Sequence, residues 1–282
     1  MNETAIEFTN VSYNYSSEKK ALDNINFQVP KGKRIAIIGH NGAGKTTMLL
    51  HMNGILRADQ GYLSINGEKM SYEKAAIKEI RKKVGIVFQD PENQLFSSDV
   101  FNDISFGLKN LDLPEEEIQQ KVLKILEQLN ISSISQQPVH FLSLGQKKKV
   151  ALAGVLVMEP EIIILDEPTA YLDPKGVRDF LASMDDLNKT EKTIILSTHD
   201  LDLAYHWADY IAVMKEGRIV SFAKVGEVFL DDRLLAEAGL EQPQLIILYK
   251  ELLKAGLIAA GVDHPLTIEQ LVRELREQNP KV

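Results

Sequence analysis

The start of the chain, through Pro30, alternates apolar and polar side chains, a pattern that predicts short strands joined by turns. The alternation is clearest at residues 5–8 (Ala-Ile-Glu-Phe) and 25–29 (Ile-Asn-Phe-Gln-Val). Residues 34–38 (Arg-Ile-Ala-Ile-Ile) instead form a nearly continuous apolar run, which is typical of a strand covered on both faces of a parallel sheet. Further strands, with helical stretches between them, are predicted at residues 84–88, 162–165, 193–197 and 210–215. The pattern therefore predicts an α/β fold with a mainly parallel sheet and a small β-rich N-terminal part.

Two later segments follow a helical period. Between about residues 90 and 159 an acidic start at residues 115–117 precedes one apolar helix face, as expected near a helix N-terminus. That face consists of Ile118, Val122, Ile125, Leu126 and Leu129. From about residue 234 the strands stop and two or three helices are predicted, one starting with a capping box at Thr267 and Gln270. We predict a main domain at residues 1–233, with a helical subdomain at about 90–159, and a helical appendage at residues 234–282.

Composition narrows the classes of function. The chain has 282 residues, no cysteine, and a net charge of −8 from 32 Lys and Arg against 40 Asp and Glu. The lack of cysteine excludes disulfides, thiolate metal sites and cysteine nucleophiles, and the acidic balance argues against an extended nucleic-acid surface. The acidic start does not resemble a secretory signal, and no run approaches the roughly 20 apolar residues that span a bilayer. We expect a cytosolic protein that would serve a membrane only through a partner.

A glycine-rich loop follows the apolar run at residues 34–38. Gly39, Gly44, Lys45 and Thr46 have the spacing of a P-loop, in which backbone N–H groups surround phosphate oxygens and the lysine reaches the β and γ phosphates. A chance match occurs in about one chain in a hundred of this length, but the preceding strand and following helix are the context that the motif needs. The residues expected to bind the nucleotide are Gly39, His40, Asn41, Gly42, Ala43, Gly44, Lys45, Thr46 and Thr47, with the Thr46 hydroxyl also on Mg²⁺.

A second acidic motif follows the apolar strand at residues 162–165. Asp166 would lie at the carboxyl edge of the sheet near the P-loop, where it could hold Mg²⁺ through water. Glu167, the next residue, would face the γ-phosphate and polarise the attacking water as a general base. The alternative is that both are solvated acidic residues in a loop, an interpretation that the presence of the P-loop disfavours.

A third motif lies at residues 142–146 (Leu-Ser-Leu-Gly-Gln). Ser143 is placed to cap a helix whose first N–H groups, near Gly145 and Gln146, could bind an anion. The alternative is a helix cap with no further role. The motif comes shortly before the strand that ends in Asp166, and a second phosphate-binding turn that cannot serve the chain's own nucleotide suggests binding to the nucleotide of a partner subunit.

With these motifs in this order, residues 6–229 resemble the ATP-binding cassette (ABC) ATPases. Residues 39–46, 162–167 and 142–146 look like the Walker A, Walker B and signature motifs of that family. The resemblance implies ATP and Mg²⁺ as ligands and four further site residues. These are Gln89 at the metal, Asp173 in the D-loop, His199 as the switch histidine, and Tyr15, upstream of the P-loop, as the aromatic that stacks on adenine, with Tyr13 as its rival.

Two positions depart from the common family pattern. Leu144 stands where the signature usually has glycine, and Tyr171 replaces a small residue before the D-loop. Because Ser143 and Gly145 are kept, we expect altered packing and retained activity. Glu167 and the other catalytic positions are filled, so two copies could form two competent sites.

A finer resemblance lies at residues 90–96 and 100–107, which are similar to the energy-coupling factor (ECF) transporter ATPases. In that family this segment receives a transmembrane T-component, which works with a substrate-binding S-component. The alternative is a surface loop whose Leu95 and Phe96 pack inward. Residues 52–56 and 200–209 are similar to the cobalt and nickel branch, so cobalt is the expected cargo, with nickel and vitamins left open. The six histidines have no metal-binding spacing, so a transported metal would be held by a partner.

The resemblance implies a peripheral subunit on the cytoplasmic face of the membrane, paired as a homodimer or with a paralogous ATPase. The appendage would assist dimerisation. Three rivals remain at this point: a soluble ABC ATPase acting on nucleic acid or ribosomes, a small-molecule P-loop kinase, and an ABC subunit of another importer class. The first usually has a long coiled-coil insertion or two cassettes, and the second does not need residues 142–146.

Overall fold

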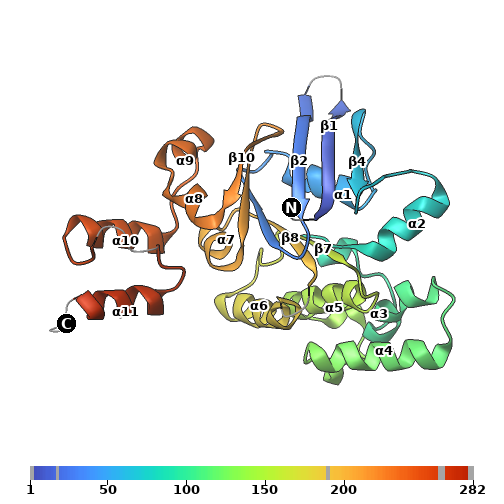
Figure 1. Cartoon of the computed structure of the whole chain (residues 1–282). Coiled ribbons are helices and arrows are strands. Elements are labelled where there is room, and N and C mark those ends of the chain that lie inside the picture. The colour runs from blue at the N-terminus through green and yellow to red at the C-terminus, as the bar shows by residue number, and fades with distance from the viewer. Residues whose placement is uncertain (1–2, 17–18, 189–190, 260–263, 279–282) are drawn as a thin grey trace.

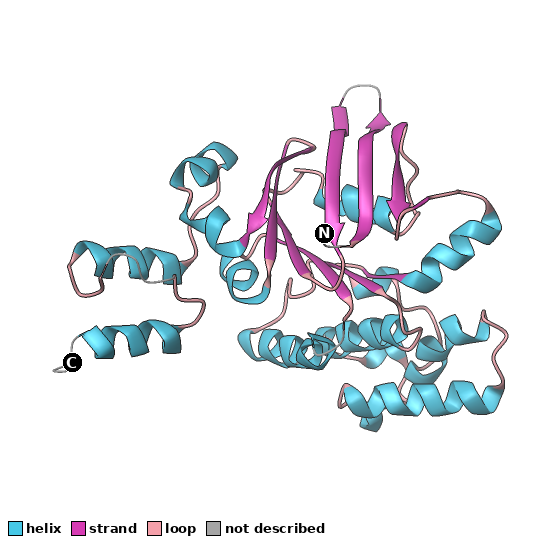
Figure 2. Ribbon diagram, viewed as in Figure 1, coloured by secondary structure: helices cyan, strands magenta, loops and turns pink. Residues whose placement is uncertain are grey.

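Residues 3–16, 19–188, 191–259 and 264–278 are described by a computed structural model. In this part of the chain an antiparallel sheet, a mainly parallel sheet and a group of helices form successive layers (Figure 1). Figure 2 shows the two sheets in magenta, with the parallel sheet lying between the antiparallel sheet and the helices. The predicted α/β architecture with an N-terminal antiparallel sheet is confirmed.

The N-terminal sheet has the strand order β2-β1-β4-β5, with antiparallel neighbours throughout. Its strands are β1 (Thr4–Ser16), β2 (Lys19–Pro30), β4 (Gln60–Ile65) and β5 (Glu68–Lys69). Alternation gives β1 and β2 one apolar face, on which Phe8 and Phe27 are buried. The two strands predicted before the P-loop strand are therefore present, and each is longer than its apolar pattern indicated.

The second sheet has the strand order β10-β9-β3-β8-β7-β6. Neighbours are parallel except for the antiparallel pair β10 and β9. The strands are β3 (Arg34–Ile38), β6 (Val84–Val87), β7 (Ile162–Asp166), β8 (Thr193–Thr198), β9 (Tyr210–Lys215) and β10 (Arg218–Lys224). Because β3, β6, β7 and β8 run parallel, their carboxyl ends meet at one edge of the sheet.

The continuous apolar runs have a direct explanation in the layers. Successive side chains of a strand point to opposite faces, and in β3 Ile35 and Ile37 belong to the apolar cluster beneath the antiparallel sheet. Ala36 and Ile38 belong to the cluster that packs against the helices. Both faces of β3 are covered, which is why its sequence does not alternate.

The helices between the strands lie on both sides of the parallel sheet, because Met48 and Leu49 of the first belong to the apolar cluster beneath the antiparallel sheet, whereas Ile104, Val122 and Leu152 belong to the cluster on the opposite face. These helices are α1 (Lys45–Met52), α2 (Lys74–Lys83), α3 (Val100–Lys109), α4 (Glu115–Gln128), α5 (Leu144–Leu156), α6 (Pro174–Asn188) and α7 (Leu201–Trp207). Short 3₁₀ turns lie at Pro91–Asn93, Ser132–Ile134 and Val139–Phe141. Ile118, Val122, Ile125 and Leu126 are buried in α4 as its period predicts. Figure 1 shows α3, α4 and α5 grouped on the side of the parallel sheet away from β1.

The C-terminal segment is helical, and its first helix begins before residue 234. It contains α8 (Val225–Leu230), α9 (Asp232–Ala238), α10 (Gln244–Lys254) and α11 (Ile268–Gln278). The capping box predicted at Thr267 is present, because Gln270 N donates to Thr267 Oγ1 over 3.2 Å and Thr267 N donates to Gln270 Oε1 over 3.3 Å. In the described residues, none of the helices combines the length and apolar character needed to cross a bilayer.

Candidate functional site

Four predicted site segments meet because the strands that carry them are neighbours. Along the edge the order β3-β8-β7-β6 places the P-loop, His199, Asp166 with Glu167, and Gln89 one after another. Ile38 lies opposite Thr198 in the ladder between β3 and β8, and Asp166 lies opposite Ser197. Strand β8 therefore separates Asp166 from the P-loop strand, and its end supplies the residues between them.

The P-loop has a backbone that only glycine fits at two positions. Gly39 has φ +153°, and a Cβ there would lie 2.2 Å from the carbonyl oxygen of Met214. Gly44 has φ +105°, and a Cβ there would lie 2.5 Å from the carbonyl oxygen of Ala21. The loop then turns back on itself, since Lys45 Nζ donates to Gly39 O over 2.7 Å and to His40 O over 3.4 Å. The local fold thus agrees with the P-loop predicted from the spacing.

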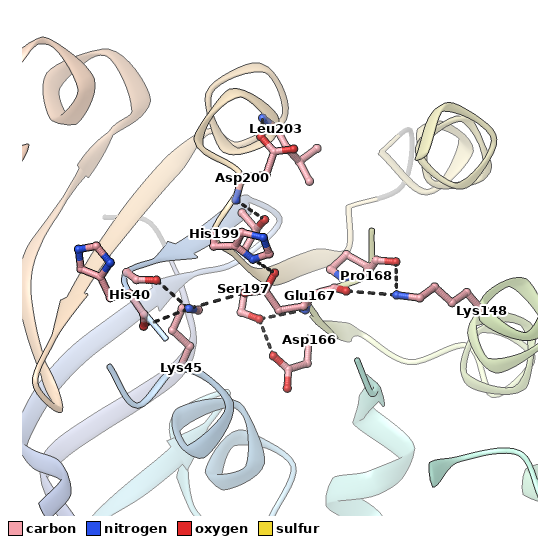
Figure 3. Close-up of polar contacts among 12 residues, drawn as sticks. His40, Lys45, Lys148, Asp166, Glu167, Pro168, Ser197, His199, Asp200 and Leu203 are labelled. Atoms are coloured by element: carbon pink, nitrogen blue, oxygen red, sulfur yellow. Dashed lines mark hydrogen bonds and ion pairs between the residues drawn. The ribbon is translucent and has the colours of Figure 1, made fainter. Parts of the chain in front are cut away.

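The ammonium of Lys45 also contacts the predicted general base. Lys45 Nζ lies 3.6 Å from Glu167 Oε1, and both side chains are buried. The other carboxylate oxygen, Oε2, lies 2.8 Å from Nδ1 of His199, whose ring is mostly exposed (Figure 3). A carboxylate held between a P-loop lysine and an exposed imidazole is placed to interact with a water near a terminal phosphate.

Asp166 is fixed from the neighbouring strand. Ser197 Oγ donates to Asp166 Oδ1 over 2.5 Å and accepts a bond from Glu167 N over 3.1 Å. The buried Ser197 hydroxyl therefore orients the predicted metal ligand and the predicted base together (Figure 3). Sequence reasoning missed Ser197, although it lies near the end of an apolar strand, just ahead of the switch histidine.

A pocket of about 820 Å³ opens along this edge, which we call the P-loop pocket. Its lining includes the predicted site residues Tyr15, Asn41, Gly42, Gly44, Lys45, Thr46, Thr47, Gln89, Glu167 and His199. Tyr15 is 62% exposed and its hydroxyl lies 3.2 Å from Thr47 Oγ1. Tyr13 packs edge-on against Tyr15 and His51, at centroid distances of 5.0 and 4.8 Å. Of the two tyrosines, Tyr15 presents its ring to this pocket.

The residues near the pocket fit Mg²⁺. Thr46 offers a hydroxyl, Gln89 an amide oxygen and Asp166 a carboxylate, and hard oxygen donors of this kind suit that ion. Asp166 is almost fully buried and Thr46 is exposed. Asp166 Oδ1 already accepts the Ser197 bond, so Oδ2 is the oxygen of Asp166 that would serve the metal site.

The signature turn belongs to a different pocket. Ser143 Oγ accepts from Gln146 N over 3.3 Å, and Gln146 Oε1 accepts from Ser143 N over 2.8 Å, so the predicted cap is a complete capping box. The turn lines a second pocket of about 510 Å³, the signature pocket. Its predicted site residues are Ser143, Gly145, Gln146 and Asp173. The signature turn and the P-loop thus line two different pockets, which adjoin at Tyr171 and Leu172.

Both departures from the family pattern line the signature pocket. Leu144 is one of its lining residues, and Tyr171 lines both this pocket and the P-loop pocket. Tyr171 has φ +63° and is 80% exposed, a backbone that glycine would adopt without strain. Asp173, which follows Leu172, accepts a bond from Gly176 N over 2.6 Å at Oδ1 and so organises the start of α6.

His40 contributes to the P-loop through its backbone, while its ring points elsewhere. Its carbonyl accepts bonds from Lys45 Nζ and, over 3.1 Å, from Ala43 N. Its ring nitrogen Nε2 lies 2.7 Å from the carbonyl oxygen of Gly239, just after α9. The predicted phosphate contact of His40 is thus confined to backbone groups, because the side chain binds the C-terminal segment.

A second residue that sequence reasoning missed is Lys148 of α5. Its side chain is buried, and Nζ donates to Pro168 O over 2.9 Å and to Glu167 O over 3.3 Å (Figure 3). Burial lowers the pKa of Lys148 to about 8, while the charges of Glu167, Asp90 and Asp166 oppose that shift. A sequence signal existed, because Lys148 shares a helix face with the buried residues Ala151 and Leu152.

The segment after Gln89 offers a small aromatic surface. Leu95 is partly buried against the core, whereas Phe96 is 65% exposed and packs edge-on against Phe106 at 4.6 Å. The turn is held by Asp103, whose Oδ2 accepts from Phe96 N over 2.9 Å and from Ser97 N over 2.8 Å. Leu95 thus packs inward as the alternative had it, and Phe96 faces outward as the docking hypothesis requires.

A P-loop, an acid-ended strand with a following glutamate, a switch histidine and a separate signature turn define an ABC-type ATPase. The family model described as ABC transporter matches residues 22–170. The energy-coupling factor transporter ATP-binding protein EcfA of Carboxydothermus hydrogenoformans is 46% identical over 247 residues, which are 88% of this chain and 90% of that protein. The EcfA protein of Methanosphaera stadtmanae is 42% identical over 94% of this chain and 95% of its own length.

Solved structures of ABC cassettes support the same family assignment. The structure of cbiO1 from Clostridium perfringens, described as part of the ABC transporter complex cbiONQ, matches with a TM-score of 0.75 and 41% identity. The match covers 88% of this chain and 99% of that one. A dimeric bacterial ABC transporter cassette matches with a TM-score of 0.72 and 27% identity over 78% of this chain and 98% of its own.

The chain therefore belongs to the ABC transporter family, as an ATP-binding protein of the energy-coupling factor type. Its enzymatic class is that of an ABC ATPase that energises transport, and it is the ATPase subunit of an ECF transporter. The predicted family and enzyme class are confirmed. These relatives exclude the three alternative interpretations, namely a small-molecule P-loop kinase, an ABC ATPase acting on nucleic acid or ribosomes, and an ABC subunit of another importer class.

Proposed function

We propose that this subunit hydrolyses ATP to drive the uptake of cobalt or nickel ions through membrane-spanning partner chains. The observation that carries the ATPase part is the meeting of Lys45, Glu167 and His199 at the P-loop pocket, while the signature turn faces another pocket. The cargo part rests on residues 52–56 and 200–209, which resemble the cobalt and nickel branch, and on the similarity to cbiO1. The names of the EcfA relatives specify no cargo, so a second candidate is that the same subunit energises vitamin uptake.

The chemistry assigns a role to each residue around the P-loop pocket. Lys45 binds the β and γ phosphates, and Tyr15 stacks on adenine. The carboxylate of Glu167 takes a proton from water, whose oxygen attacks the γ-phosphorus as the bond to the bridging oxygen of ADP breaks. His199 orients that carboxylate through its 2.8 Å contact and senses the γ-phosphate. Thr46, Gln89 and, through a water, Asp166 would hold Mg²⁺, which when bound would supply positive charge to offset that of the phosphates.

We propose that two such subunits assemble head to tail. Ser143, Gly145 and Gln146 would bind the γ-phosphate of the partner's ATP through a helix N-terminus, together with Asp173. ATP then favours the closed pair and hydrolysis favours the open one. A matching solved cassette is dimeric, which supports this arrangement. Both a homodimer and a pair with a paralogue are consistent with the complete set of site residues.

The membrane partners would dock at the outward-facing Phe96 and Phe106. Nucleotide-driven movement at Gln89 would be passed along residues 90–96 to a transmembrane T-component, which works with a substrate-binding S-component. The subunit would then sit peripherally on the cytoplasmic face of the membrane. In the appendage at residues 234–282, Ile247, Leu248, Ile268 and Val272 are exposed apolar residues, which supports its proposed role in dimerisation.

The base assignment is tested with Glu167→Gln in the full chain. Loss of the basic oxygen should lower ATP turnover by about a hundredfold or more while ATP binding is kept. Steady-state phosphate release and nucleotide binding are measured on the same sample. Near-normal turnover in this variant would remove Glu167 from the role of base.

The cargo assignment is tested by uptake. The subunit is co-expressed with T- and S-components from its own organism, reconstituted in vesicles, and supplied with ATP. Cobalt, nickel and a panel of vitamins are compared, with Glu167→Gln as the matched inactive control. Uptake of cobalt or nickel supports the first candidate, whereas uptake of a vitamin alone replaces it with the second.

A further inference from the structure

One buried lysine joins the signature helix to the turn that carries the predicted base. Lys148 is 2% exposed and lies in α5, within two turns of Ser143 at the N-terminus of that helix. Its Nζ donates to the carbonyl oxygens of Glu167 and Pro168, at 3.3 and 2.9 Å. Figure 3 shows the side chain extending from α5 to this turn, on the side away from Lys45 and His199.

The turn it reaches has a strained backbone. Glu167 has φ +43°, a left-handed conformation that a residue with a side chain adopts only when its surroundings hold it there. On one side Glu167 N donates to Ser197 O and Ser197 Oγ, each over 3.1 Å. On the other side, bonds from the Lys148 ammonium hold the carbonyls, and charged donors make the stronger hydrogen bonds. Strand β8 and helix α5 therefore fix this conformation from opposite sides.

We infer that Lys148 is a positioning residue for ATP hydrolysis, which holds the Glu167 carboxylate in line by clamping the backbone of residues 167 and 168. The inference rests on the proposed role of Glu167. Lys148 also links the two nucleotide sites of a pair of subunits, because α5 carries Ser143–Gln146 at its N-terminus. The helix that would grip the partner's nucleotide is the helix that positions the base for the chain's own nucleotide.

The test uses Lys148→Met in the full chain, because methionine keeps the length and apolar stem but has no donor. We expect the turnover number to fall at least tenfold, while the dissociation constant for ATP stays within threefold. ATP retained through rapid desalting should remain as unhydrolysed nucleotide, as in Glu167→Gln, because the P-loop and signature turn are intact. Backbone amides of Glu167 and of residues 169–171 should exchange with deuterium faster than in the unsubstituted chain.

A matched control is Lys192→Met, which removes a lysine that contacts the backbone at the opposite end of β7. Lys192 Nζ donates to Pro160 O, which lies just before β7, whereas Lys148 Nζ donates to Pro168 O, which lies just after that strand. Burial lowers the pKa of Lys192, as it does that of Lys148. This variant should keep turnover within twofold. Lys148→Arg, which retains charged donors, should recover a substantial part of the turnover that Lys148→Met loses. Lys148→Gln, which keeps a neutral donor, should fall between them, and it replaces Lys148→Met if that variant does not fold.

Three results would overturn the inference. One is unchanged turnover in Lys148→Met and Lys148→Gln. Another is loss of retained ATP together with turnover, which would place the effect at the signature turn. The third is an equal loss in Lys192→Met, which would make it a general effect of removing a lysine that donates to the backbone next to β7. If Glu167→Gln itself keeps normal turnover, the proposed function fails first and independently of Lys148.

Discussion

Lys45 Nζ lies 3.6 Å from Glu167 Oε1, and both side chains are buried at the edge of the P-loop pocket. The P-loop lysine therefore has an acidic partner of its own in addition to the carbonyls of Gly39 and His40. A γ-phosphate that takes a bond from Lys45 competes with this carboxylate. At the same time it brings negative charge toward Glu167, so the two anions share one cation.

Replacing Glu167 with Gln should therefore tighten ATP binding as well as stop turnover. The amide keeps the shape of the side chain but removes its charge, which eases the competition for Lys45. We expect the dissociation constant for ATP to fall about fivefold, equivalent to about 1 kcal/mol, in a fluorescence titration at equilibrium. Glu159→Gln, which alters an exposed pair with Lys121, is the control and should change nothing. Equal or weaker ATP binding by Glu167→Gln would contradict the competition.

Tyr15 provides a test of base stacking. Its ring is exposed in the P-loop pocket and its hydroxyl lies 3.2 Å from Thr47 Oγ1. Stacking a base on an aromatic ring contributes about 1–3 kcal/mol, so Tyr15→Ala should raise KM for ATP roughly tenfold. Tyr15→Phe keeps the ring and should change KM by less than threefold. Equal effects of the two substitutions would assign the contribution to the hydroxyl instead.

The sequence predicted the meeting of the site segments because their positions follow from strand order and direction. Once β3, β7 and β8 are recognised as buried parallel strands, Gly39, Glu167 and His199 must emerge at one edge. The spacing of the motifs then predicted the chemical role of each of these three residues. The same pattern did not predict β4, β5 or β10, because strands with several exposed or half-exposed positions lack a strong apolar period.

The supporting contacts could not be predicted in the same way. Whether Ser197 reaches Asp166, and whether Lys148 reaches Glu167, depends on how elements distant in sequence pack together. His40 shows the converse, since its motif position fixes the backbone while the ring binds Gly239, far along the chain. Motifs determine the groups that touch the nucleotide, and tertiary packing determines what holds those groups.

Ser197 should affect the metal requirement. Residues that orient a metal ligand without touching the metal change affinity by about 10–100-fold when removed. Ser197→Ala removes the donor to Asp166 Oδ1, so the Mg²⁺ concentration for half-maximal ATPase should rise about tenfold. Thr193→Val is the control, since its buried hydroxyl bonds Gly32 N at the other end of β8. A matching rise in both variants would point to the stability of β8 as the cause.

Asp209 predicts a pH dependence of stability. It accepts bonds from Arg34 N over 2.9 Å and Arg34 Nη2 over 2.8 Å, joining the starts of β3 and β9 at the end away from the P-loop. Partial burial raises the pKa of Asp209, but the Arg34 bonds and charge outweigh it and lower the pKa below 3.8. A lowered pKa in the folded state means that the charged carboxylate adds stability above about pH 4, and that this is lost as pH falls through the folded pKa.

Asp209→Asn should therefore reduce stability at pH 7 by about 1 kcal/mol, a modest value because the side chains are about a third exposed. In a chain of this size Tm should fall by about 2–4 °C, and the difference from the unsubstituted chain should shrink as pH drops below 4. Glu79→Gln is the control, since its solvent-exposed pair with Lys82 should leave Tm unchanged at pH 7. ATP turnover should be preserved in both variants, because neither residue borders the P-loop pocket. A Tm difference for Asp209→Asn that stays constant from pH 7 to pH 3 would show that the lost charge is not its cause.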